Sequence, residues 1–221
     1  MKKTLLLIAV LFLTSLISYA QTEKGSQTFG LNLGFNYNKT SGAYINPYDN
    51  SSSDAGVKTT AFNIGPSYSY FVSDKLDLGV SLSYGQSNTT NANTSINPTK
   101  QSSYAFISSV YLRKYCMFGD KFGIRVGPYL GYEKGDNKSA FLGSNALYSE
   151  TSKQTGYSAG ARLEFVYYPS KKLGFAAYLA SVNYDHNKFD DGSFGHFNSD
   201  NVDLSLINNG LSLSVFYTFG K

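Results

Sequence analysis

The side chains best suited to catalysis gather in one polar stretch near the C-terminal end of the chain. His186 and His196, the only two histidines, share that stretch with Asp190, Asp191 and Ser193. A serine, a histidine and a carboxylate can form a hydrolytic triad, and His and Asp can bind a metal ion, but both sites need a geometry that spacing alone does not supply. The chain carries no motif that fixes such a geometry. We therefore predict a solvated loop here, with no catalytic residue, no metal site and no cofactor.

Five charged residues form a second candidate site: Asp77, Arg113, Arg125, Arg162 and Glu164. Each falls on the polar side of a segment whose other side is apolar. Arg113 and Arg125 stand almost symmetrically about the turn between them, so they should lie close together and need the carboxylates of Asp77 and Glu164 between them. Such a set could act as a gate or a proton-linked site. We favour the simpler interpretation, a structural charge network that fills an interior.

The segments that carry these charges alternate in polarity with a period of two, which is typical of β-strands with one apolar face. From Phe29 to Tyr37 every second residue is apolar, and the residues between are Gly or Asn. The same alternation recurs over 62–70, 76–84, 104–112, 122–133, 157–167, 173–184 and 204–219. Two strands change phase, at 179–182 and at Asn208-Asn209-Gly210, and one extra residue at such a point indicates a β-bulge. The sequence thus predicts an all-β fold of eight antiparallel strands.

The connections between these strands alternate in length. Short turns fall near 73–75, 119–121 and 169–172, and long links rich in Asn, Ser, Asp and Gly fall near 39–57, 89–100, 135–154 and 186–201. An even number of antiparallel strands, with short turns on one side and long loops on the other, is the pattern of an up-and-down transmembrane β-barrel.

Composition and the N-terminal residues agree with a secreted membrane protein. Only 15% of the 221 residues are charged and the formal net charge is +4, so there is no basic cluster for nucleic acid. Lys2 and Lys3 precede an apolar run over 5–17 and then Ser18-Tyr19-Ala20, which is the pattern of a cleavable signal peptide. We expect a signal peptide at 1–20 and a barrel domain at 21–221. The single cysteine, Cys116, has no partner for an internal disulfide, so the fold is not a disulfide scaffold. Because 114–118 holds no His or carboxylate, Cys116 is expected to be a packed thiol.

The polarity of the two faces indicates which one meets lipid. The second face carries Gly, Ser, Asn, Arg and Glu, which would coat a soluble barrel poorly but would fill a narrow polar lumen well. Aromatic residues should form two girdles, Tyr37, Phe62, Tyr84, Tyr104, Tyr132, Tyr157 and Tyr184 at the loop ends and Tyr70, Phe122, Tyr167, Tyr217 and Phe219 at the turn ends. Phe122 and Tyr132 are ten residue steps apart, a height of about 26 Å at ~3.4 Å per step and a tilt of ~40°, which matches the apolar band of such barrels.

These features resemble the small eight-stranded outer-membrane barrels of the OmpX type and the membrane domain of the OmpA type. The terminal run of Leu211, Leu213, Val215, Tyr217 and Phe219 looks like the C-terminal signal that the barrel assembly machinery reads in those families, although Gly220-Lys221 follows the aromatic residue. The resemblance implies the outer membrane of a two-membrane bacterium. It also implies contact with outer-membrane lipid and lipopolysaccharide.

Three functions remain open on the sequence. We favour an integral barrel with a structural or surface-interaction, adhesion-like role, whose lumen is occluded by side chains and whose loops 39–57, 135–154 and 186–201 contact surface ligands. The first alternative is a narrow transport barrel for small or hydrophobic molecules, with a tunnel or a lateral opening. The second is a lipid-modifying outer-membrane enzyme, which would need His, Ser and a carboxylate to converge at the outer rim.

Overall fold

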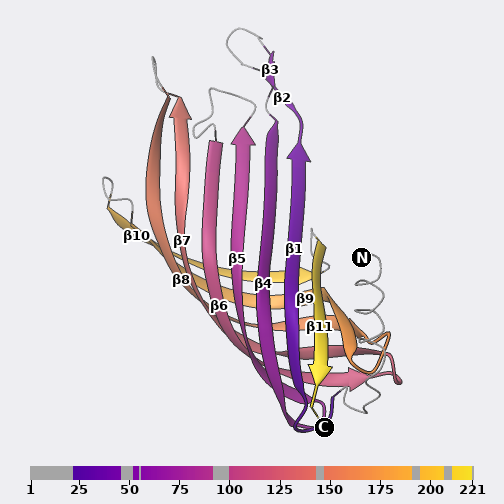
Figure 1. Cartoon of the computed structure of the whole chain (residues 1–221). Coiled ribbons are helices and arrows are strands. Elements are labelled where there is room, and N and C mark those ends of the chain that lie inside the picture. The colour runs from indigo at the N-terminus through magenta and orange to yellow at the C-terminus, as the bar shows by residue number, and fades with distance from the viewer. Residues whose placement is uncertain are drawn as a thin grey trace, which may run out of the picture.

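The computed structural model describes residues 22–45, 52–54, 56–91, 100–142, 147–190, 195–206 and 211–220. All its regular elements are strands: β1 (Gln27–Thr40), β2 (Ala43–Ile45), β3 (Ser52–Asp54), β4 (Val57–Ser73), β5 (Leu76–Asn91), β6 (Lys100–Met117), β7 (Phe122–Leu142), β8 (Leu147–Tyr167), β9 (Leu173–Asp190), β10 (His196–Leu206) and β11 (Leu211–Phe219) (Figure 1). Within these residues no helix is long and apolar enough to cross a membrane.

The long strands close into a ring of eight antiparallel positions. Pairing runs in chain order from β1 through β4, β5, β6, β7 and β8 to β9. β11 pairs with both β9 and β1 and so closes the ring, and β10 pairs with β9. β10 and β11 therefore share the eighth position, while β2 and β3 form a separate small hairpin. The predicted all-β, eight-stranded antiparallel fold is confirmed.

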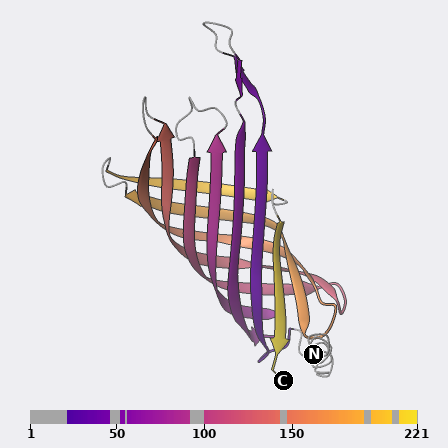
Figure 2. The same ribbon diagram turned by 45° about the horizontal axis from the view of Figure 1, so that its top comes forward.

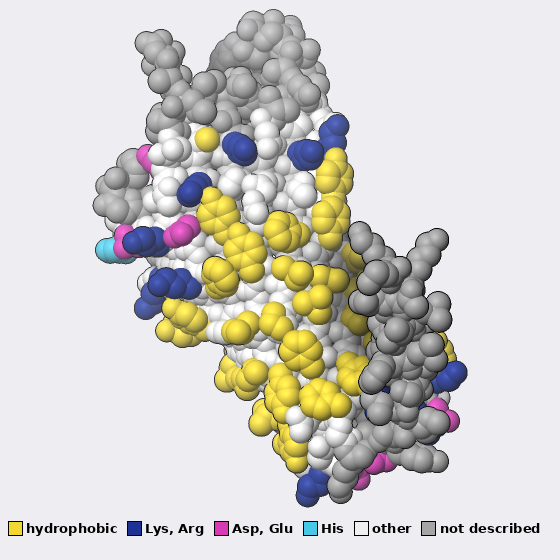
Figure 3. Space-filling view, in the orientation of Figure 1, with side chains coloured by type: hydrophobic (Ala, Val, Ile, Leu, Met, Phe, Trp, Pro, Cys, Tyr) yellow, Lys and Arg dark blue, Asp and Glu magenta, His cyan; other side chains and the backbone are white. Residues whose placement is uncertain are grey.

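Alternate residues of each strand face outward, and along most of the wall these are the apolar ones. Cys116, which we expected to be packed, is exposed on this outer face. Outward-facing Phe29, Leu82, Phe106 and Leu130 are each more than half exposed, whereas their neighbours along the strands point into the ring. Figure 3 shows the resulting hydrophobic band around the visible face. Aromatic and branched side chains suit such a surface because they pack on the pleat beside their cross-strand neighbours.

The short turns lie together at one end of the ring, where consecutive strands end within a few residues of each other. Backbone hydrogen bonds tie this end together, for example from Tyr115 N to Lys75 O at 2.8 Å and from Thr218 N to Lys172 O at 2.7 Å. The opposite end carries the far tips of β1, β4, β5, β6, β7 and β8 and the small β2–β3 hairpin (Figure 1).

The ring is irregular where the eighth position changes from β10 to β11. The part of β9 nearer the short turns pairs with β11, up to the pair of Ala177 with Leu213. The part nearer the loop end pairs with β10, starting at the pair of Ala180 with Leu206. The ladder between β1 and β11 ends at Phe35–Leu211. Beyond it, β1 and β10 run in different directions in both views (Figures 1 and 2).

The first predicted phase change is present in the ladder between β8 and β9. Leu163 pairs with Ala180 and Glu164 pairs with Tyr178, so Leu179 is an extra residue on β9. The second, at Asn208-Asn209-Gly210, lies outside the described residues, as does the expected signal peptide at 1–20.

Candidate functional site in the barrel lumen

The first pair of the lumen charges is Asp77 and Arg113. They stand directly opposite each other in the ladder between β5 and β6. Arg113 Nε donates to Asp77 Oδ1 at 3.0 Å and Nη2 donates to Oδ2 at 2.5 Å, a two-point contact that suits the planar guanidinium. The Asp77 side chain is 0% exposed, so this contact replaces the water that the carboxylate has lost.

The second pair is Arg125 and Glu164, which stand directly opposite each other between β7 and β8. Arg125 Nε donates to Glu164 Oε2 at 2.6 Å, and the Arg125 side chain is only 2% exposed. Because each charged residue has its partner at the same level of the next strand, the strand register itself sets the pairing.

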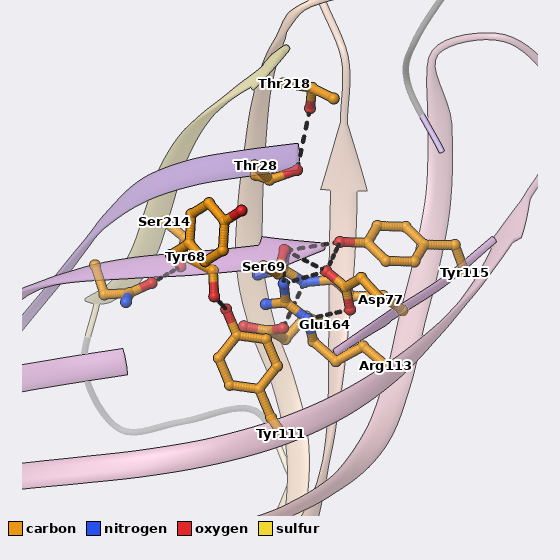
Figure 4. A network of polar contacts seen from close by, with 12 residues as sticks. Thr28, Tyr68, Ser69, Asp77, Tyr111, Arg113, Tyr115, Glu164, Ser214 and Thr218 are labelled. Atoms are coloured by element: carbon orange, nitrogen blue, oxygen red, sulfur yellow. Dashed lines mark hydrogen bonds and ion pairs between the residues drawn. The ribbon is translucent and has the colours of Figure 1, made fainter. Parts of the chain in front are cut away.

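Tyr115 joins the two pairs. Its hydroxyl donates to Asp77 Oδ2 at 3.1 Å and accepts from Arg125 Nη1 at 3.3 Å. Ser69 also donates to Asp77 Oδ2, at 2.8 Å. The side chains of the two pairs, Tyr115 and Ser69 come from β4, β5, β6, β7 and β8, and together they make one polar network that crosses the lumen (Figure 4).

Arg162, the fifth charged residue that we assigned to this network, lines the same cavity as Arg113, Arg125 and Glu164 but forms no ion pair with a described carboxylate. Its guanidinium carbon is 3.9 Å from the centroid of the Tyr129 ring, and its side chain is exposed. Among the described residues no carboxylate lies within ion-pair distance of Arg162, because Arg125 occupies Glu164 and Arg113 occupies Asp77.

An apolar cluster closes the lumen on the turn side of the charges. It consists of Phe71, Tyr115, Val166, Tyr168, Ala176 and Phe216, each at most 4% exposed. The Phe71 and Tyr115 rings lie 5.4 Å apart, and Tyr168 meets Phe216 edge-on at 5.5 Å. We expected a polar interior throughout, and at this end that expectation is wrong. The signal was available in the sequence, since Phe71, Val166 and Phe216 stand at inward-facing positions of their strands.

On the loop side of the charges, the lumen is lined by polar side chains and contains two hollows. A cavity of about 60 Å³ lies between Arg113, Arg125, Arg162 and hydroxyl groups such as those of Ser81 and Ser109, which are 2.7 Å apart. A larger hollow of about 290 Å³ follows on the inward faces of β1, β4, β5 and β6 and reaches Leu211 and Ser212. The described lumen is thus filled at its turn end and hollow toward its loop end.

His186 lies on β9 and His196 begins β10, so the prediction of a solvated loop over 186–201 is wrong for the strand residues on either side of 191–194. Each histidine contacts an aspartate at the outer rim. His186 Nδ1 lies 2.8 Å from Asp200 Oδ1, and His196 Nδ1 lies 3.4 Å from Asp190 Oδ1. Hydrogen bonds from Tyr184 and His186 lower the pKa of the Asp200 carboxyl, which sits above the apolar outer face of β10. Asp191 and Ser193 lie outside the described residues, and within them no group of three His, Cys, Asp or Glu side chains could hold a metal ion.

The aromatic residues assigned to the girdles lie on the outward face. At the loop end, Tyr132 and Tyr157 pack at 5.3 Å and Phe62 and Tyr84 at 6.3 Å between ring centroids. At the turn end, Phe122 stacks on Tyr167 at 4.9 Å. The C-terminal run from Leu211 to Phe219 pairs along its whole length with β1, so it forms the strand that closes the ring.

Comparison with solved structures gives several small outer-membrane barrels. OprG from Pseudomonas aeruginosa is 15% identical with a TM-score of 0.50, over 91% of this chain and 100% of that one. Ail, the attachment invasion locus protein of Yersinia pestis, is 16% identical with a TM-score of 0.38, over 89% and 99%. No curated protein sequence matches. At this identity the OprG likeness supports the fold alone.

A family model described as outer membrane protein beta-barrel domain matches residues 19–187, which is most of the chain. The match agrees with the closed antiparallel ring and its apolar outer band. The chain therefore belongs to the outer membrane protein beta-barrel domain family, and it resides in the outer membrane of a Gram-negative bacterium.

Proposed function

We propose that this barrel acts at the cell surface, in a structural or adhesion-like role, and does not carry solutes through its lumen. The observation that supports this most strongly is the double closure at the turn end. The apolar cluster around Phe216 and the network of Asp77, Arg113, Tyr115, Arg125 and Glu164 lie one above the other. Eight strands enclose an interior that side chains can just fill, and these side chains occupy its turn end.

Two strands extend well beyond the outer girdle, and this extension supports a role at the cell surface. β7 continues for ten residues beyond Tyr132, to Leu142, which is roughly 26 Å of additional height at the strand rise and tilt used above. β8 runs beside it with continuous pairing from Tyr157 to Leu147. This rigid hairpin would hold a binding surface clear of the membrane, where a strand-based site is better ordered than a loop.

A second candidate is passage of small hydrophobic molecules through the side of the barrel, and the divergence of β10 from β1 favours it. β10 presents Val202, Leu204 and Leu206 outward, each at least 67% exposed, at the level of the lipid. Among the described residues β10 pairs with no strand except β9. The 290 Å³ hollow reaches Leu211, next to this place.

We propose no catalytic role. Each histidine contacts an aspartate, and within the described residues no serine completes a triad with them.

The surface role is tested by shortening the β7–β8 hairpin. Replacing residues 139–150 with Asn-Gly joins Lys138 to Thr151, which are already paired, through a tight turn. Cells that display the shortened barrel should lose adhesion to host-cell layers, while the heat-modifiable gel band shows normal folding. Adhesion equal to that of the parent would contradict the proposal.

The side route is tested with Ser212→Trp, which fills the hollow. If apolar molecules pass there, uptake of a hydrophobic dye by intact cells falls in this variant and is unchanged by Ser139→Trp on the distant hairpin. Equal uptake in all three proteins would remove the second candidate.

A further inference from the structure

Lysines occupy the lipid-facing side of the strands just above the outer aromatic girdle. Three of them, Lys134 on β7, Lys153 on β8 and Lys188 on β9, line one hollow of about 540 Å³ together with Thr155 and Asn198. We call these five residues the rim lysine site. Asp136, Asp190 and His196 also line this hollow. Figure 3 shows the same placement on its visible face, with basic side chains above the hydrophobic band.

The strand register arranges the rim lysine site as a triangle. Lys134 pairs with Thr155, and Thr155 pairs with Lys188, so the two lysines flank one hydroxyl across three strands. Their backbones are two strand spacings apart, about 10 Å. Lys153 stands two residues above Thr155 on the same strand face. Three lysines thus lie around one threonine on the outer face.

The height of the site matches the lipid headgroups. Lys134 is two residues above Tyr132, whose ring packs on Tyr157 in the outer girdle. Two residues add about 5 Å along the membrane normal at the strand rise and tilt of such barrels. Aromatic girdles sit at the boundary of the hydrocarbon, so this step places Lys134 and Lys188 at the level of phosphate groups, with Lys153 two residues higher.

The charges at the site remain available for a ligand. Asp136 and Asp190 flank Lys153 in the ladder, but Asp190 lies against His196 at 3.4 Å. Within the described part of the chain, no carboxylate lies at ion-pair distance from any of the three lysines. Two other rim lysines already contact an aromatic ring. Lys58 lies over the Tyr37 ring at 5.7 Å, and Lys138 lies over the Tyr104 ring at 5.4 Å.

We propose that the rim lysine site binds the phosphorylated headgroup of an outer-leaflet glycolipid of the lipid A type. Phosphate oxygens would accept hydrogen bonds from the three ammonium groups and from Thr155 and Asn198. The acyl chains would lie on the apolar band directly below. The site goes beyond the surface role proposed above and depends only on membrane residence, so either proposal can fail without the other.

The test uses the purified full-length barrel in detergent and labelled lipid A that carries two phosphates. The variant Lys134→Gln/Lys153→Gln/Lys188→Gln is compared with a control of equal charge change at the turn end, Lys75→Gln/Lys114→Gln/Lys121→Gln, where all three residues are exposed. Each lysine near an anionic lipid surface contributes about five-fold to affinity, so the rim variant should bind roughly 100-fold more weakly. The control should bind more than ten-fold tighter than the rim variant.

Two further arms identify the source of the phosphate. Lipid A stripped of its phosphates should bind the parent protein as weakly as intact lipid A binds the rim variant, and millimolar inorganic phosphate should not displace intact lipid A. Equal binding of the stripped lipid, equal losses in both lysine variants, or displacement by inorganic phosphate would each overturn the proposal. Should the rim variant fail to fold, the comparison of the two lipids on the parent protein decides the question.

Discussion

Asp77 and Arg113 face each other directly across the β5–β6 ladder, and the two-point contact between them forms one level of the network that crosses the lumen. The Asp77 carboxylate also accepts from Ser69 and Tyr115, so a fully buried charge has three donors. Removing one partner from such a pair costs far more than replacing both, because the remaining charge is left without water and without a counter-charge.

Asp77→Ala should therefore lower the free energy of unfolding by about 3 kcal/mol. Urea titration of the protein in lipid vesicles measures this value. Asp77→Ala combined with Arg113→Met should recover most of the loss, because no unpaired charge remains. A double variant as unstable as the single one would show that the charge pair is not the cause.

Glu164 and Arg162 offer a matched comparison on one strand. Glu164→Ala leaves Arg125, which is 2% exposed, without its carboxylate and should cost about 3 kcal/mol. Arg162→Ala breaks no ion pair but removes the contact with the Tyr129 ring, and should cost about 1 kcal/mol. Equal costs in the same unfolding experiment would contradict the assignment of Arg125 and Glu164 as the paired residues.

The apolar closure depends on Gly174, which faces the Phe216 ring. A Cβ atom at this position would overlap the ring, so Gly174→Ala should push Phe216 aside and destabilise the barrel by about 1–3 kcal/mol. Gly85→Ala is the control, because a Cβ there would meet no atom closer than 3.7 Å. Similar stabilities of the two variants would show that Phe216 is not tightly held.

Phe219 ends the closing strand at the turn-side girdle. Phe219→Asp should reduce the amount of folded protein in the outer membrane, because it places a charge at the lipid boundary and alters the end of the expected assembly signal. The measurement is the ratio of heat-modifiable to unfolded bands on a gel. Phe197→Asp, at a more exposed position near the loop end, should leave that ratio unchanged. Normal folded levels of Phe219→Asp would count against the expected signal.

The period-two pattern predicted the eight strands because every residue of such a wall meets either lipid or lumen, and the two surroundings demand different side chains. The identity of the ion pairs could not follow from that pattern. Three arginines and two carboxylates allow several pairings, and only the register, which sets Asp77 opposite Arg113 and Arg125 opposite Glu164, selects among them. The separation of β10 from β11 was also beyond the local pattern, since it depends on which strand each segment pairs with at long range.

Conductance across a planar lipid bilayer tests the closed lumen most directly. The parent protein should give no steady current, because Phe216 and the network around Asp77 and Arg125 block the turn end. Phe216→Gly combined with Tyr168→Gly removes two rings of the cluster and should give small, reproducible openings while the gel band still shows a folded barrel. Steady channels from the parent protein that also pass sugars would contradict the account.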